Sequence, residues 1–132
     1  MTTRAVPVDV LTVDDSPEFL AAARELIAGT AGFRAVGEAA SAEEGLAAAG
    51  RLDPDLVLLD VRLDGMDGIQ AARRLHEASP DVVILLISVE DLTDIPAAAR
   101  NCGAAAFVRK DRLTPKTLGA LWARAAPAQR RR

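Results

Sequence analysis

The sequence has few of the residues that build disulfides or hydrolytic triads. Its 132 residues include one cysteine, one histidine and no tyrosine, and aromatic residues make up 3% of the chain. A single cysteine excludes an internal disulfide, which suits a reducing compartment, so we expect a cytoplasmic protein. The N-terminal segment has no long apolar core, and no apolar run approaches the length of a bilayer span. We therefore expect neither a signal peptide nor a membrane-spanning segment.

A strong charge of either sign is also missing. The formal net charge is −3 at pH 7, and the shares of hydrophobic (50%) and charged (27%) residues are ordinary for a globular protein. This balance gives no reason to expect direct nucleic-acid or membrane binding. The length predicts one domain over residues 1–126, followed by a basic tail (127–132) that we expect to be disordered.

Apolar runs alternate with segments that begin at helix-capping residues. The runs predict five strands, at residues 8–13, 33–38, 56–60, 81–87 and 104–108. Caps and helix breakers predict five helices, which begin at Ser16, Ser41, Asp67, Asp94 and Thr114. Pro96 lies near the first turn of the fourth helix and should shorten it.

This alternation predicts an α/β fold, namely a flavodoxin-like doubly wound sheet of five parallel strands with five helices on its two faces. The expected strand order is 2-1-3-4-5, which places strands one, three, four and five side by side. Their carboxyl ends carry Asp14–Asp15, Asp60, Ser88 and Lys110 respectively. Ligands of such sheets bind at this edge, so we expect a polar site there.

Three acids at one sheet edge repel each other unless positive charge compensates them. Lys110 offsets one charge, and Mg²⁺ suits the remainder because it binds through carboxylates, waters and a phosphate. Asp60 then stays ionised and can act as a nucleophile, while Lys110 and the Ser88 hydroxyl contact the phosphoryl oxygens. The alternative for Ser88 and the acidic pair is a purely structural role as helix caps.

In this order and spacing, the residues resemble the response-regulator receiver domain over residues 8–126. The match comprises the acidic pair Asp14–Asp15, the acceptor Asp60, the hydroxyl of Ser88, Lys110, and Phe107 as the switch aromatic. The segments 13–17, 36–39 and 65–68 look most like receivers that precede helix-turn-helix DNA-binding domains.

The resemblance implies that a histidine kinase, a phosphotransfer protein or a small phosphodonor phosphorylates Asp60. It implies Mg²⁺ held by Asp15, Asp60 and the backbone carbonyl of Arg62, with Asp14 acting through water. Slow hydrolysis of the acyl phosphate would then reset the protein, which would catalyse no other reaction.

The resemblance also implies a conformational switch. Ser88 moves onto the phosphoryl group and Phe107 turns inward, which repacks the face formed by the fourth helix, the fifth strand and the fifth helix. That face would regulate a partner or an output domain, and a homodimer is compatible with it. Pro96 puts the usual use of this face in doubt.

Other functions stay open at this point. A pseudo-receiver would be a binding module that phosphorylation does not regulate, and Pro96 weakly favours it. A phosphatase with an aspartate nucleophile usually needs a second acid two residues later, where this chain has Arg62. A further hypothesis pairs Arg62 with Glu90 across the mouth of the site, where they would restrict the water that hydrolyses the acyl phosphate. Two solvated surface charges are the alternative.

Overall fold

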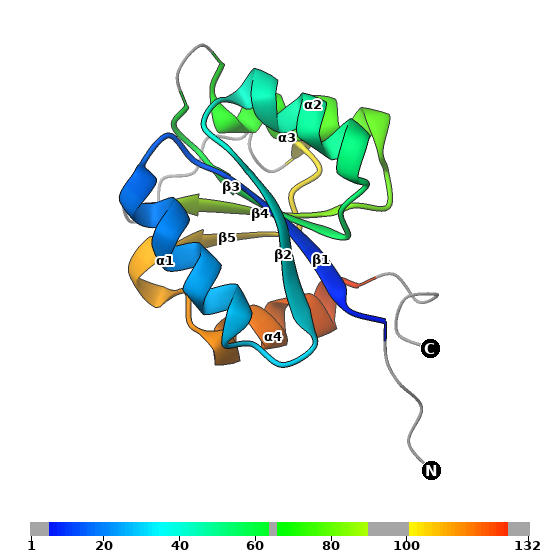
Figure 1. The fold of residues 1–132 in the computed structure, drawn as a ribbon. Coiled ribbons are helices and arrows are strands. Elements are labelled where there is room, and N and C mark those ends of the chain that lie inside the picture. Colours follow the sequence, from blue (N-terminus) through cyan, green and yellow to red (C-terminus); the bar gives the residue numbers. More distant parts are fainter. Residues whose placement is uncertain (1–5, 64–65, 90–100, 127–132) are drawn as a thin grey trace.

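Five parallel strands form one sheet (Figure 1). The structure is a computed structural model, and it describes residues 6–63, 66–89 and 101–126. The strands are β1 (Val8–Val13), β2 (Phe33–Ala39), β3 (Leu56–Asp60), β4 (Val83–Ser88) and β5 (Ala106–Arg109). They lie in the order β2-β1-β3-β4-β5, and each neighbouring pair is parallel. The predicted fold class and strand order are therefore confirmed.

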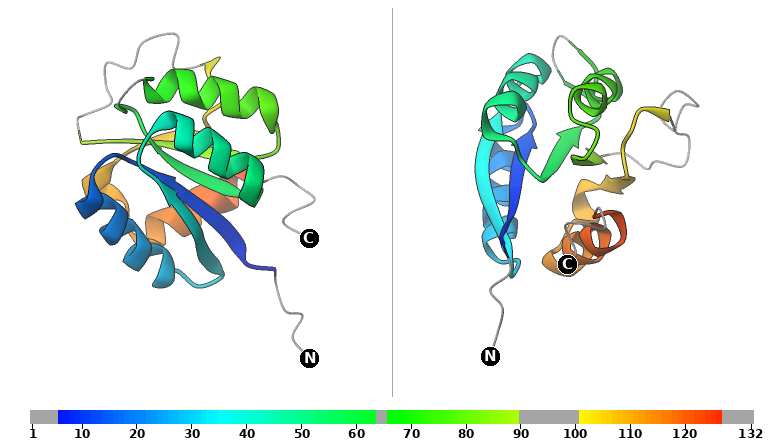
Figure 2. Two further views of the ribbon diagram at one scale, coloured as in Figure 1. Left: turned by 45° about the horizontal axis from the view of Figure 1, so that its top comes forward. Right: turned by 90° about the vertical axis from the view of Figure 1, so that its right-hand side faces the viewer.

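Helices cover both faces of this sheet. Within the described residues they are α1 (Pro17–Ala28), α2 (Ala42–Leu52), α3 (Gly68–Ala78) and α4 (Pro115–Ala125), with a short 3₁₀ turn, η2 (Lys110–Arg112), before α4. Helices α2 and α3 lie on one face, and α1 and α4 lie on the other (Figure 2). None of these helices combines the length and hydrophobicity needed to cross a bilayer.

Three sequence predictions fall outside the described residues. The helix expected to begin at Asp94, with Pro96 in it, lies largely in the segment 90–100 that the structure does not describe. The proposed partner of Arg62, Glu90, belongs to the same segment. The basic tail 127–132 is likewise outside.

Four predicted capping residues begin the four described helices. The first N–H groups of a helix have no partner within it, and a side-chain oxygen just before the helix accepts from one of them. The pairs are Ser16 with Phe19 N–H (3.2 Å), Ser41 with Glu44 N–H (3.1 Å), Asp67 with Gln70 N–H (2.7 Å) and Thr114 with Thr117 N–H (3.1 Å). Local sequence therefore sets where each described helix begins.

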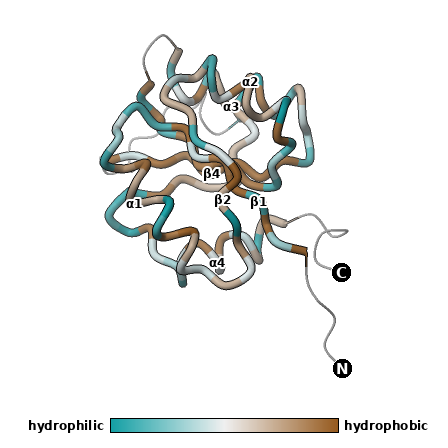
Figure 3. The backbone as a smooth tube through the Cα atoms, in the orientation of Figure 1, coloured by the Kyte–Doolittle hydropathy of each residue, from teal (hydrophilic) through white to brown (hydrophobic). Residues whose placement is uncertain are grey.

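The core has two layers because successive side chains of a strand point to opposite faces of the sheet. On β3, Val57 and Leu59 pack in the layer under α2 and α3, whereas Leu56 and Leu58 pack in the layer under α1 and α4. The central strands are apolar along their length, while the helices carry hydrophilic residues as well (Figure 3). All residues of β3 and β4 are buried, as their unbroken apolar runs predict.

Two strands begin later than expected. Strand β4 begins at Val83 rather than at residue 81, because the Val82 N–H donates to Ser79 O in a turn (3.1 Å) before the ladder starts. Strand β5 begins at Ala106 rather than at residue 104 and extends to Arg109, which pairs with Ser88. Gly103, in the left-handed region at φ +95°, turns the chain just before this strand.

Candidate functional site at the carboxyl edge of the sheet

Two carboxylates from adjacent strands are buried at the carboxyl edge of the sheet. Asp14 directly follows β1 and is fully buried, and Asp60 is the last residue of β3 and is 7% exposed. The neighbouring Asp15 is exposed. Backbone donors hold one oxygen of each buried carboxylate: Ser16 N–H donates to Asp14 Oδ1 (2.8 Å) and Arg62 N–H donates to Asp60 Oδ1 (2.9 Å). The other oxygen of each carboxylate is left for a different partner.

That partner is Lys110, the residue that directly follows β5. Its ammonium nitrogen lies 2.7 Å from Asp14 Oδ2 and 3.4 Å from Asp60 Oδ2, and its side chain is 15% exposed. The Asp14 contact is close but lacks hydrogen-bond alignment, and Asp14 Oδ2 has no hydrogen-bond partner among the described residues. One partly buried cation therefore lies against two buried carboxylates that come from sequence positions 46 residues apart.

Burial and charge shift the pKa values of this cluster. Burial is the largest influence on Asp60 and raises the pKa of its carboxyl from 3.8 to about 6. The nearby Asp14 charge contributes to this rise in the pKa of Asp60, whereas the Arg62 N–H and the Lys110 charge oppose it. For Lys110, burial favours the neutral amine, but the close contacts with Asp14 and Asp60 together outweigh it, and the pKa of Lys110 is raised.

Ser88 and Phe107 lie on the neighbouring strands β4 and β5. Ser88 ends β4 and is buried, one position after Ile87, which is the register partner of Asp60. Phe107 of β5 pairs with Leu86 of β4, is partly buried, and packs on the layer under α2 and α3. The topology thus brings Ser88 to the same edge as the acids, and it places Phe107 two strands away from Asp60.

The start of α3 packs directly on the backbone of Asp60. A Cβ atom on Gly68 would lie 2.0 Å from the Asp60 carbonyl oxygen, which no side chain allows. The Gly68 N–H donates to Val61 O at 2.7 Å, so the two segments are joined at this point. Glycine at position 68 therefore permits the close approach that fixes the end of β3 and its carboxylate.

The donor set fits a hard divalent cation. Asp14, Asp15 and Asp60 each offer one carboxylate oxygen, and these oxygens lie within 4.8 Å of one another. Asp14 Oδ2 is also a buried acceptor with no hydrogen bond from the described residues, although the Lys110 ammonium nitrogen lies 2.7 Å from it. Mg²⁺ takes oxygen ligands, commonly one or two carboxylates with waters and a phosphate. The residues present are therefore suited to Mg²⁺, with Lys110 as a second source of positive charge.

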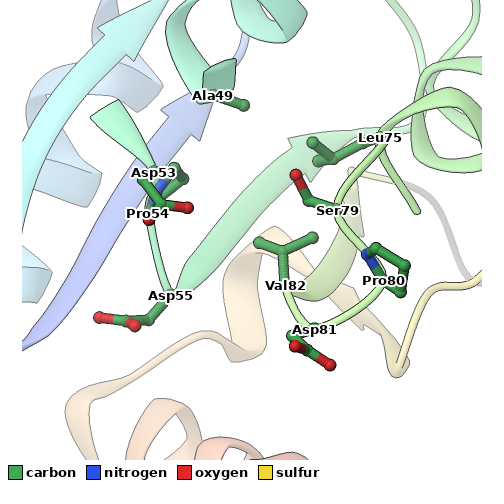
Figure 4. A pocket seen from close by; sticks show the side chains of 9 residues that line it. All are labelled: Ala49, Asp53, Pro54, Asp55, Leu75, Ser79, Pro80, Asp81 and Val82. Carbon is green, nitrogen blue, oxygen red and sulfur yellow. The ribbon is translucent and has the colours of Figure 1, made fainter. Parts of the chain in front are cut away.

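Sequence reasoning missed two features of the molecule. The first is the contact of Phe19 with Lys110, in which the ring centroid lies 4.4 Å from the ammonium nitrogen. The position of Phe19 in the first turn of α1, next to the carboxyl edge, is the sequence feature that could have indicated this contact. The second feature is a cavity of about 370 Å³ at the opposite edge, lined by residues before β3 and β4 such as Pro54, Asp55 and Asp81 (Figure 4).

Comparisons with known proteins agree with this arrangement. The family model of the response regulator receiver domain matches residues 10–121. The chain is 34% identical over 120 residues to the nitrate/nitrite response regulator NarL of Escherichia coli, covering 91% of this chain and 56% of NarL. It is 35% identical over 101 residues to the response regulator GacA of Pseudomonas viridiflava, covering 76% and 47%.

A solved structure is similar over nearly its whole length. The signal receiver domain of the NarL response regulator from Mycobacterium tuberculosis superposes with a TM-score of 0.78 at 31% identity, covering 88% of this chain and 97% of that one. The chain spans about half the length of the curated relatives described above. With the confirmed strand order and the family match over residues 10–121, this chain belongs to the response-regulator receiver domain family of two-component systems.

Proposed function

We propose that the protein is a phosphorylation-dependent switch that accepts a phosphoryl group on Asp60. The observation that carries the proposal is the position of the Lys110 ammonium, 2.7 Å from Asp14 and 3.4 Å from Asp60 at the edge where ligands of such sheets bind. A partly buried lysine between two buried acids is costly to assemble unless the site binds further charge. A phosphoryl group with its metal ion would be that charge.

Asp60 acts as the nucleophile. One of its carboxylate oxygens attacks the phosphorus of a phosphohistidine, the P–N bond breaks, and the imidazole leaves and takes up a proton. With a small acyl phosphate as donor, a P–O bond breaks and the carboxylate leaves. Asp60 Oδ1 is already held by the Arg62 N–H, so we assign the attack to Oδ2, the oxygen that faces Lys110.

Asp60 and the neighbouring acids would together hold Mg²⁺. We assign this role to Asp14, Asp15, Asp60 and the backbone carbonyl of Arg62, with Asp14 acting through a water molecule. The bound ion supplies positive charge for the phosphoryl oxygens. Lys110 would contact these oxygens from the end of β5, as a donor that is already in place for the charge that develops during transfer. The Ser88 hydroxyl would contact them from the end of β4.

The output of the switch is a repacked surface. We propose that Ser88 moves onto the phosphoryl group and that Phe107 turns inward. The face formed by β5, α4 and the helix predicted to begin at Asp94 would change in consequence. This face would regulate a partner or an output domain, because relatives such as NarL and GacA extend well beyond the part that matches this chain.

The partners of the protein follow from the same proposal. A cytoplasmic histidine kinase or a phosphotransfer protein would supply the phosphoryl group, and the activated protein would be able to form a homodimer.

Incubation with acetyl phosphate and Mg²⁺, followed by intact-mass measurement, tests the proposal. Wild-type protein should gain the mass of one phosphoryl group, and Asp60→Asn should gain none. No gain for the wild type would favour the pseudo-receiver. Sustained turnover of phosphate esters would instead indicate a phosphatase, for which the place two residues after Asp60 lacks the usual acid.

A further inference from the structure

The aromatic ring of Phe19 covers one side of the Lys110 ammonium. The nitrogen lies 4.4 Å from the ring centroid, well within the range of a cation–π contact. Phe19 belongs to the first turn of α1 and is partly buried against the layer under α1 and α4. The two carboxylates and the ring together surround a cation whose side chain keeps 15% of its exposure.

A closed circuit of contacts fixes the ring in this place. Asp14 Oδ1 accepts from Ser16 N–H (2.8 Å), and Ser16 Oγ accepts from Phe19 N–H (3.2 Å). The Phe19 ring contacts the ammonium of Lys110, which in turn lies 2.7 Å from Asp14 Oδ2. One carboxylate thus holds the lysine with one oxygen and, with the other, the turn that presents the ring to that lysine.

The chemistry of the ring suits this position. A third carboxylate would compete with Asp60 for the ammonium, and a water molecule would solvate it. The face of an aromatic ring carries partial negative charge without a lone pair, so it attracts the ammonium only weakly and excludes water from that side. The Lys110 ammonium then interacts mainly with the carboxylates of Asp14 and Asp60.

We propose that Phe19 is a positioning residue for phosphoryl transfer, whose ring holds the Lys110 ammonium against Asp14 and Asp60. This inference rests on the proposed phosphorylation of Asp60. It differs from a packing role, because packing depends on the size and shape of the ring, whereas positioning of a cation depends on the charge distribution of its face.

Fluorination of the ring separates these two roles. Pentafluorophenylalanine, incorporated at position 19 alone, keeps a phenyl ring but reverses the charge of its face. We expect the rate of Asp60 phosphorylation by acetyl phosphate to fall about fivefold, the equivalent of about 1 kcal/mol, with intermediate rates for rings that carry fewer fluorines. The melting temperature should stay close to that of the wild type.

Phe33 offers a matched control. It packs edge-on against Trp122, with ring centroids 6.3 Å apart, and lies at the start of β2, far from the carboxyl edge. Pentafluorophenylalanine at position 33 should leave the phosphorylation rate unchanged. A spectroscopic readout without phosphorylation is available as well: in Phe19→Leu, the Lys110 Hε signals should move downfield, because the shielding ring is lost.

The outcomes distinguish this proposal from the proposed function. Normal labelling of the wild type, with an equal rate for pentafluorophenylalanine at position 19, would overturn the role of Phe19 alone. Unshifted Lys110 signals in Phe19→Leu would also overturn it. Absence of labelling in the wild type would overturn the phosphorylation of Asp60, whatever the NMR signals of Lys110 show.

Discussion

Each edge of the sheet has a group of three aspartates, one at the candidate site and one around the cavity, and the two groups differ in what surrounds them. At the carboxyl edge, Asp14 and Asp60 are buried against Lys110. At the amino edge, the cavity is lined by Asp53, Asp55 and Asp81 (Figure 4). Among the described residues, only the group at the carboxyl edge brings carboxylate oxygens close enough to share a metal ion.

Two of the three acids that line the cavity at the amino edge have structural roles. Asp53 ends α2 in the left-handed conformation (φ 50°), and Asp55 Oδ2 accepts from the Asp9 N–H at 2.8 Å, tying β1 to the start of β3. Asp53 and Asp81 are exposed to water. The comparison teaches that acidic residues near strand ends do not make a site by number alone. Burial and a shared cation distinguish the carboxyl edge.

Removal of that cation should have the largest effect. In Lys110→Ala, the phosphoryl oxygens lose a donor that is already in place, and we expect phosphorylation by acetyl phosphate with Mg²⁺ to slow by about 100-fold. The rate is measured by intact mass over time. Asp81→Asn, an exposed acid of the other edge, is the control and should react as the wild type does. Equal rates for Lys110→Ala and wild type would show that Lys110 has no part in the transfer.

The sequence predicted which residues lie together at the carboxyl edge, because each of them follows an apolar run. The end of a run at Asp14, Asp60, Ser88 and Lys110 marks the end of a strand, and parallel strands bring such ends together. It could not tell which member of the acidic pair faces inward. Consecutive residues beyond a strand end have no fixed alternation, and only the finished fold buries Asp14 and exposes Asp15.

Other features depended on contacts between distant segments. The ring of Phe19 meets Lys110 across 91 positions of sequence, and no pattern within α1 specifies that contact. The need for glycine at position 68 arises from the Asp60 backbone, which packs on it from another element. The late starts of β4 and β5 follow from turn hydrogen bonds and a left-handed glycine, which the apolar runs do not reveal.

The contact at Gly68 gives a second way to disturb only one edge. Gly68→Ala places a Cβ atom against the Asp60 carbonyl, and we expect it to lower the free energy of unfolding by about 2 kcal/mol. Gly50→Ala is the matched control, since a Cβ atom there meets nothing within 4 Å and the residue lies in α2. That variant should be more stable than the wild type, by about 0.5 kcal/mol. Urea unfolding measures both, and similar values for the two variants would contradict the close approach.

The smallest effect concerns the pH dependence of stability without divalent cations. Because burial raises the pKa of Asp60 from 3.8 to about 6, the folded state holds this proton more tightly than the unfolded state. The resulting stabilisation is present below pH 3.8 and is lost as the pH rises to about 6. Asp60→Asn carries no such charge, so above pH 6 it should exceed the wild type in stability by about 1 kcal/mol.

This advantage should shrink as the pH falls toward 4, where Asp60 of the wild type is neutral in the folded protein. Denaturant unfolding at several pH values provides the measurement. Asp55→Asn serves as the control from the amino edge, because its carboxylate accepts a backbone hydrogen bond and its loss should destabilise the protein. A constant difference between Asp60→Asn and wild type at all pH values would contradict the raised pKa.

Titration with Mg²⁺, followed by the backbone amide signals in ¹H–¹⁵N NMR spectra, tests the central contrast between the two edges most directly. We predict saturable shifts at Asp14, Asp15, Asp60 and Arg62, small or no shifts at Asp53, Asp55 and Asp81, and much weaker binding in Asp60→Asn. Equal shifts at both edges, or none at the carboxyl edge, would contradict the assignment of a single metal-dependent site to Asp14, Asp60 and Lys110.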